Sequence, residues 1–174
     1  MKILTKVLMV LAIVFTLSFF AWGVVRIVNE VDFNINCTQY IKRAADANTI
    51  ETAKEELKKA ITYAEENNLT EGIVSIFFKQ PKNDVGFWYK NMKESYSELE
   101  NLPSDATALE KTNVLMKLRE TLTDEKDSGV SVTIPAGISV YPNNALYFWW
   151  ACISAILACV MWVLTYFLWN EYCY

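Results

Sequence analysis

The chain has 174 residues, a formal net charge of −4, 53% hydrophobic residues and no histidine. A net-negative chain lacks the basic face that offsets phosphate repulsion, so the composition argues against nucleic acid as a partner. The absence of histidine removes the commonest general base and the commonest metal ligand.

A first apolar segment lies near the N-terminus. Residues 7–25 contain no charge, Lys2 and Lys6 precede them, and Arg26 follows. Such a stretch makes roughly 28 Å of helix, which matches a hydrocarbon core of about 30 Å. We predict a transmembrane helix over residues 7–28. It is expected to remain as an uncleaved signal-anchor, because no clear Ala-x-Ala site follows it. A cleaved signal peptide is the alternative.

A second apolar segment, residues 145–169, also contains no charge. Aromatic residues mark both of its ends, as expected at the two interfaces of a membrane span. Small residues at helical spacing form a stripe along it, and such stripes let another helix approach closely. The stripe, a candidate helix–helix interface, consists of Ala151, Ser154, Ala155 and Ala158. Its expected partner is the first span or a helix of another protein; the alternative is that small residues are simply common in such helices.

Lysines before the first span predict which way the chain crosses the membrane. By the positive-inside bias, residues 1–6 are cytoplasmic, residues 29–144 form an extracytoplasmic domain, and residues 170–174 return to the cytoplasm. We expect a bacterial cytoplasmic membrane with the domain on its periplasmic or extracellular side. Residues 27–144 contain 13 Lys or Arg and 19 Asp or Glu, as in an ordinary, mildly acidic domain.

Helical periodicity dominates the middle domain. Apolar residues at spacings of three and four predict a helix from about Thr38 to Asn67. A second helix follows Asp84, which can act as its N-cap. Thr107 and Glu110 form a capping-box pattern near the start of a third. The predicted fold is therefore mostly α: two transmembrane helices flanking an extracytoplasmic helical bundle.

Two shorter segments have a different pattern. Residues 130–134 alternate apolar with polar side chains, which predicts a short extended or β segment before the second span. The segment 31–35 is a candidate partner strand. The apolar run 73–78 is compatible with a short helix or with a buried strand.

An aromatic cluster surrounds a proline-containing loop. It could line a small apolar pocket or partner surface, insert into the membrane surface beside Lys79 and Lys82, or form a corner of the core. The cluster consists of Phe77, Phe78, Phe87, Trp88 and Tyr89, with Tyr96 nearby.

No catalytic, metal-binding or phosphate-binding motif is present in the sequence, so we expect no enzyme and no cofactor. The favoured hypothesis is a structural or interaction protein, as an accessory or assembly subunit of a membrane complex or as a homo-oligomer. Its partners would be the lipid bilayer and a membrane protein or a second copy. An extracytoplasmic ligand-binding or sensory module, which would have to signal through a membrane partner, is the first alternative. A membrane-permeabilising protein is the second.

Overall fold

The computed structural model describes residues 2–126 and 129–173. It divides into two compact units, one comprising Met1–Asn29 and Asn143–Tyr174 and the other Glu30–Pro142. The described part of the chain is mostly helical, with one small two-stranded sheet. The last residue of the expected tail, Tyr174, lies outside the described residues.

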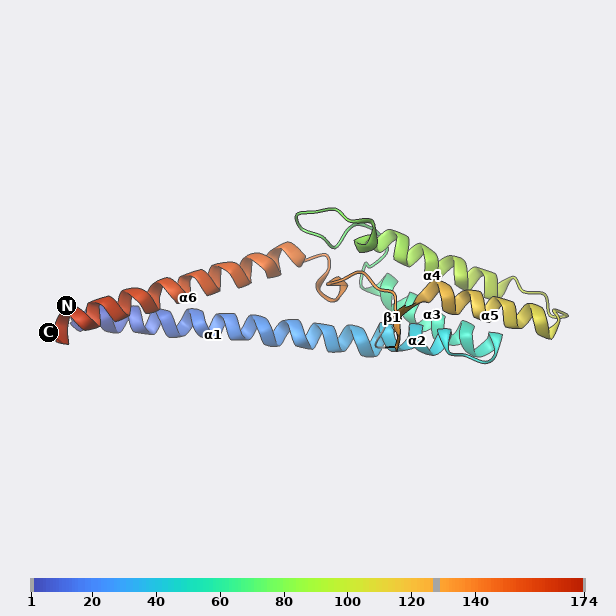
Figure 1. The fold of residues 1–174 in the computed structure, drawn as a ribbon, viewed down its shortest axis with the longest axis horizontal. Coiled ribbons are helices and arrows are strands. Elements are labelled where there is room, and N and C mark those ends of the chain that lie inside the picture. The colour runs from blue at the N-terminus through green and yellow to red at the C-terminus, as the bar shows by residue number, and fades with distance from the viewer. Residues whose placement is uncertain (1, 127–128, 174) are drawn as a thin grey trace. The chain divides into compact units, whose positions relative to one another are not determined.

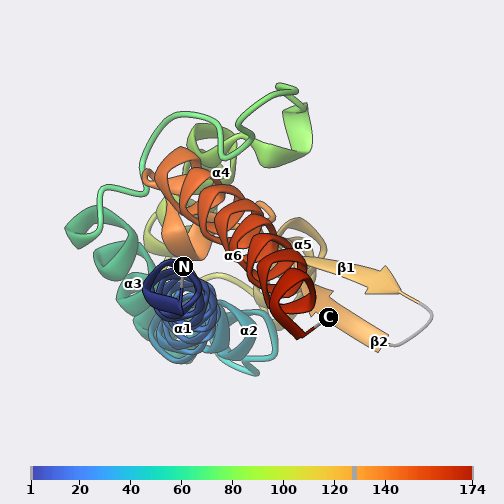
Figure 2. The same ribbon diagram turned by 90° about the vertical axis from the view of Figure 1, so that its left-hand side faces the viewer.

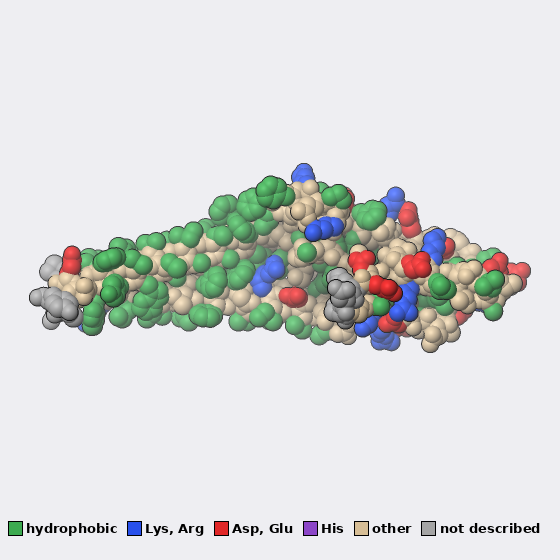
Figure 3. Space-filling model, in the orientation of Figure 1, with side chains coloured by type: hydrophobic (Ala, Val, Ile, Leu, Met, Phe, Trp, Pro, Cys, Tyr) green, Lys and Arg blue, Asp and Glu red, His purple; other side chains and the backbone are tan. Residues whose placement is uncertain are grey.

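The first unit consists of two long helices, shown in blue and red in Figure 1. Helix α1 spans Lys2–Phe33, of which the first unit takes the part up to Asn29, and α6 spans Asn144–Cys173. The two helices run antiparallel, so that the start of α1 and the end of α6 lie at the same end of this unit. Hydrophobic side chains cover their surface (Figure 3). Both helices are long and apolar enough to cross a membrane, as the sequence predicts.

The second unit begins within α1. A π-helical segment, Asn34–Thr38, continues α1 directly into α2, Gln39–Ala45. The Gln39 backbone N–H donates to the carbonyl of Asn34, five residues earlier, as the wider π turn requires. Spacings of three and four along this stretch place four buried side chains on one face. These are Phe33, Cys37, Ile41 and Ala44.

The predicted single helix from Thr38 to Asn67 is wrong, because the chain turns at residues 46–49. Helix α3, Ile50–Glu66, starts afresh after this turn. The Thr49 hydroxyl caps it by accepting from the backbone N–H of Thr52 at 3.2 Å. A capping residue inside a helical pattern thus divides one predicted helix into two that pack against each other.

Two further helices complete the bundle, and both begin as the sequence predicts. Asp84 caps α4, Val85–Glu100, through a 3.0 Å hydrogen bond from the backbone N–H of Phe87. Thr107 and Glu110 form the capping box at the start of α5, Ala108–Leu122. Helix α3 packs between α2 and α4, and α5 contacts α2 and α4.

A short hairpin follows α5. Strand β1, Thr123–Lys126, pairs antiparallel with β2, Gly129–Val132, with Thr123 opposite Val132. The hairpin projects beside α5 in Figure 2. The predicted extended segment is therefore present, but the proposed partner strand, residues 31–35, is wrong because that segment is helical. Pairing with the adjacent strand needs only a very short connection and so loses little chain entropy.

The apolar run 73–78 forms neither of the two predicted structures. It belongs to a loop that is closed at its base by an isolated bridge between Ile73 and Asp84. Backbone hydrogen bonds from Val74 to Asn83 (3.0 Å) and from Val85 to Gly72 (2.8 Å) fix this base. A 3₁₀ turn, Pro81–Asn83, forms the returning side.

Candidate functional site

Side-chain hydrogen bonds join the two helices of the first unit. An indole N–H is a donor with no acceptor function, so it needs a hydroxyl or carbonyl partner wherever water is excluded. Two such donors on α6 find hydroxyls on α1, and an amide–phenol pair adds a third bond. The pairs are Trp162 Nε1 to Thr16 Oγ1 (3.1 Å), Trp150 Nε1 to Ser18 Oγ (3.0 Å) and Asn29 Nδ2 to Tyr147 Oη (3.1 Å).

The small-residue stripe is mainly buried within the same unit. Ser154 is 3% exposed and Ala158 9%, whereas Ala151 and Ala155 are half-buried. The Ser154 hydroxyl donates to the carbonyl of Trp150 (2.7 Å), so its polar group is satisfied along its own helix. The small residues of the stripe therefore allow a neighbouring helix to approach closely, and Ser154 makes its hydrogen bond within α6 rather than to α1.

Sequence reasoning missed Thr16 and Ser18 as pairing residues. They are among the few hydroxyl side chains in an otherwise apolar segment. A hydroxyl surrounded by apolar residues in a membrane-length helix was the available signal, because such groups commonly bond across helices.

The structure does not bring the five residues of the aromatic cluster into one site. Trp88 is 6% exposed, and its ring centroid lies 6.3 Å from that of Phe33, so it is part of the core. Tyr89 is half-buried, whereas Phe78 (79%), Phe87 (63%) and Phe77 (62%) are exposed. The core-corner interpretation thus holds for Trp88 and is wrong for the three phenylalanines.

A cavity of about 360 Å³ lies in the second unit beside two members of the cluster, Phe87 and Trp88. Its volume is at the lower end of the range of ligand pockets, about 300 to 1,000 Å³. Its wall combines the loop before α4, α4 itself, the end of α5 and the segment after β2. The remaining lining residues are Pro81, Lys82, Asp84, Asn91, Thr121, Leu122, Thr133, Ile134 and Pro135.

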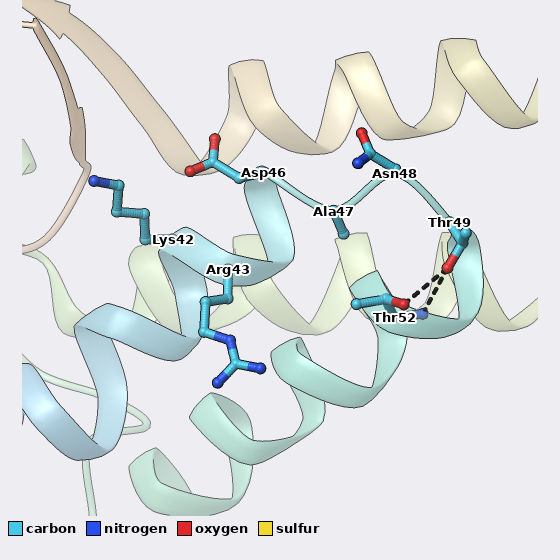
Figure 4. Close-up of a pocket in the computed structure, with 7 residues that line it drawn as sticks. All are labelled: Lys42, Arg43, Asp46, Ala47, Asn48, Thr49 and Thr52. Atoms are coloured by element: carbon cyan, nitrogen blue, oxygen red, sulfur yellow. Dashed lines mark hydrogen bonds between the residues drawn. The ribbon is translucent and has the colours of Figure 1, made fainter.

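A second cavity, of about 420 Å³, lies at the turn between α2 and α3. Figure 4 shows that its basic side chains diverge: Lys42 extends toward the side to which Asp46 is directed, whereas Arg43 points the other way. The Thr49 hydroxyl is already engaged with Thr52.

A buried carboxylate was not expected from the sequence. Glu56 on α3 is 3% exposed, its Oε2 lies 3.1 Å from Arg43 Nε, and its Oε1 lies 3.0 Å from Lys59 Nζ. The pair with Arg43 connects α2 to α3, so we assign Glu56 to the structure of the bundle. It follows Glu55 in a charged run, which made it look like part of a solvated face.

Comparisons of the chain with protein-family models, with curated proteins and with solved structures find no match. Any functional assignment therefore rests on the geometry above. Among the residues that the structure describes, no group of three or more Asp, Glu or Cys side chains is placed to hold a metal ion.

A polar cluster connects α3 to α4 on the surface of the bundle. Glu65 accepts a hydrogen bond from the Tyr89 hydroxyl and lies 3.1 Å from Lys93 Nζ. The hydrogen bond from Tyr89 and the contact with Lys93 lower the pKa of Glu65 below its usual value of 4.5. The Glu65 carboxylate in turn raises the pKa of Lys93.

We expect this cluster to make the stability of the domain depend on pH at the acid end. A carboxyl with a lowered folded-state pKa stabilises the fold above pH 4.5, and the contribution is lost as pH falls through the lowered pKa. Because Glu65 is exposed, the effect is small, about 0.2 to 1 kcal/mol. Unfolding of the Glu65→Gln variant should show a weaker loss of stability below pH 4.5 than the natural chain.

The matched control is Glu66→Gln, which removes the neighbouring exposed carboxylate. This variant should retain the acid-dependent loss. An equal response of both variants would show that the cluster around Glu65 does not contribute.

Proposed function

We propose that this chain is a membrane-anchored interaction protein. Its two apolar helices cross the bilayer, and the helical domain between them lies on the extracytoplasmic side. The observation that carries the proposal is that one continuous helical stretch serves as anchor and as domain. It carries the uncharged residues 7–25, and it then supplies Phe33, Cys37 and Ile41 to the core of the second unit.

The partner surface that we favour is the outer face of α5. Leu109 and Met116 are 69% and 56% exposed, and seven residues place them on the same side of the helix. Neighbouring Thr112 is also exposed. Two exposed apolar side chains on the same side of a helix support contact with a membrane protein or with a second copy of the chain.

For the small-residue stripe we propose a role in pairing the two spans. Ala158→Ile should weaken the pairing by about 1 to 3 kcal/mol, because added methyl groups at a closely packed position force the helices apart. Unfolding of the full chain in increasing SDS measures the effect. Cys159→Ile, at the adjacent exposed position, is the matched control and should leave the curve unchanged. Equal curves for both variants would contradict the assignment.

The proposal as a whole is tested by purifying the full chain in mild detergent, identifying co-purifying proteins by mass spectrometry and measuring its mass by light scattering. A stoichiometric membrane partner or a defined homo-oligomer supports an interaction protein. A clean monomer contradicts it. Leu109→Glu with Met116→Glu should release the partner if α5 carries the contact.

The cavity beside Phe87 and Trp88 favours a second candidate, an extracytoplasmic ligand-binding or sensory module. A ligand that binds only the folded state raises the unfolding temperature. Screening small apolar compounds against the full chain in detergent tests this candidate. An increase that Thr133→Trp abolishes, by filling the cavity, would support it. Failure of every compound to raise the temperature would count against it.

A further inference from the structure

The loop between Ile73 and Asp84 presents an apolar tip. Ile76, Phe77 and Phe78 are 39%, 62% and 79% exposed, and Phe87 in the first turn of α4 is 63% exposed. We call these four residues the aromatic tip. Exposing several large apolar side chains close together on one small domain is unfavourable in water, which indicates a surface that meets another apolar phase.

The base of the loop is held in place. Besides the bridge at Ile73, the Asn83 side-chain amide donates to the Ser75 hydroxyl at 2.6 Å. On the other side of the base, the Tyr141 hydroxyl donates to the carbonyl of Glu71 at 2.9 Å. A β-carbon on Gly72 would overlap this hydroxyl, so the chain approaches Tyr141 closely at that point.

Tyr141 ties the loop to the segment that leads to the second span. It precedes the first residue of α6, Asn144, by three positions. Three residues extend at most about 11 Å. The connection from Tyr141 to the first residue of α6 is therefore short along the chain.

The helical connection between the first predicted span and the domain is also short. The Trp88 ring packs against that of Phe33, the last residue of α1. In the sequence, Trp88 comes directly after Phe87 of the aromatic tip. Phe33 lies five residues beyond the predicted span 7–28, which is about 7.5 Å of helix. Both segments through which the domain joins its anchors thus contact the part of the domain that carries the tip.

Charges beside the tip complement lipid headgroups. Lys79 directly follows Phe78, Lys82 lies three residues further along the loop, and both are exposed. The acidic groups nearby are Glu71 and Asp84, and the Asp84 carboxylate caps α4. Aromatic residues next to lysines are typical of segments that lie at the boundary between headgroups and acyl chains.

From these observations we propose that the aromatic tip inserts into the interface of the same bilayer that α1 and α6 cross, with Lys79 and Lys82 beside lipid phosphates. The inference rests on the proposed function in requiring that the two helices span a membrane. It adds a third, peripheral contact, which would fix the orientation of the domain on the membrane surface.

The test uses the full chain in vesicles, with an environment-sensitive fluorophore on a single reactive cysteine and nitroxide-labelled lipids as quenchers. Cys152, Cys159 and Cys173 are replaced by alanine, and Cys37 remains because it is buried. Phe78→Cys then reports on the tip. Asp105→Cys, in the exposed turn before α5, is the control for a position in water. A chain that keeps Cys159 is the control for a position in the bilayer.

We expect nitroxides near the headgroup end of the acyl chain to quench the label at position 78, and not the label at position 105. Added phosphatidylglycerol should increase this quenching, and Lys79→Glu with Lys82→Glu should abolish the increase. Quenching at position 159 without quenching at position 78 overturns the insertion while the spans stand. Quenching at neither position overturns the spans themselves. A change in emission at position 78 that rises with the protein-to-lipid ratio and does not depend on the nitroxides shows contact with another copy and also overturns the insertion.

Discussion

Leu57→Ala is expected to destabilise the domain by about 3 to 5 kcal/mol, because it removes a large side chain from a fully buried position and leaves a cavity. Leu57 belongs to the core cluster and lies on α3, which packs against α2 and α4. Thermal unfolding of the full chain in mild detergent, followed by circular dichroism, measures the change. The transition of the domain should fall by roughly 10 °C or more.

Leu109→Ala provides the matched control, since Leu109 is 69% exposed on the outer face of α5. An exposed substitution of this kind should change stability by no more than about 0.5 kcal/mol. A similar small effect for both variants would contradict the placement of Leu57 in the core.

Gly72→Ala is expected to cost about 2 to 3 kcal/mol, combining left-handed backbone strain with the loss of one hydrogen bond. Gly72 has a φ of +96°, and an added β-carbon would overlap the Tyr141 hydroxyl. The substitution should therefore displace Tyr141 from the carbonyl of Glu71. Unfolding in detergent gives the cost, and greater proteolysis of the loop would report the loosened base.

Two further variants distinguish the backbone strain at Gly72 from its close approach to the Tyr141 hydroxyl. Gly129→Ala also places alanine at a positive φ, +111°, but in open space, so it should show the backbone strain alone. Tyr141→Phe removes the hydroxyl that an alanine at position 72 would meet. Gly72→Ala should therefore cost less in the Tyr141→Phe background than in the natural chain. Equal costs in the two backgrounds would show that the close approach is not the reason for glycine here.

Features fixed by neighbouring residues could be predicted from the sequence. The cap at Asp84 and the capping box of Thr107 and Glu110 use side chains within three residues of the helix start, so the pattern alone locates them. The two membrane-length helices follow from uninterrupted apolar runs.

Features that depend on distant residues could not be predicted in this way. The turn before α3 lets α3 fold back on α2, where Glu56 is buried beside Arg43. Helical spacing places Glu56 nearer the apolar face of α3 than Glu55, but its burial depends on the contact with α2. The error over β2 was of another kind, because its partner is the segment directly before it and was sought further away.

Part of the candidate site could likewise be predicted from the sequence, and part of it could not. Aromatic residues around Pro81 were recognised, and the spacing of Val85, Trp88 and Met92 predicts the apolar face of α4 on which Trp88 is buried. Periodicity could not show that Trp88 packs against Phe33 at the end of α1. The hydrogen bonds from Trp150 and Trp162 to α1 likewise required both helices to be placed.

The central claim is that two spans hold the domain on the outer side of a membrane, and cysteine labelling in intact cells tests it most directly. In a chain that retains only Cys37 and Cys173, Asp105→Cys is treated with a membrane-impermeant maleimide. The account predicts that position 105 is labelled in intact cells and that Cys173 is labelled only after the membrane is opened. Labelling of both positions in intact cells, or of neither before lysis, would contradict it.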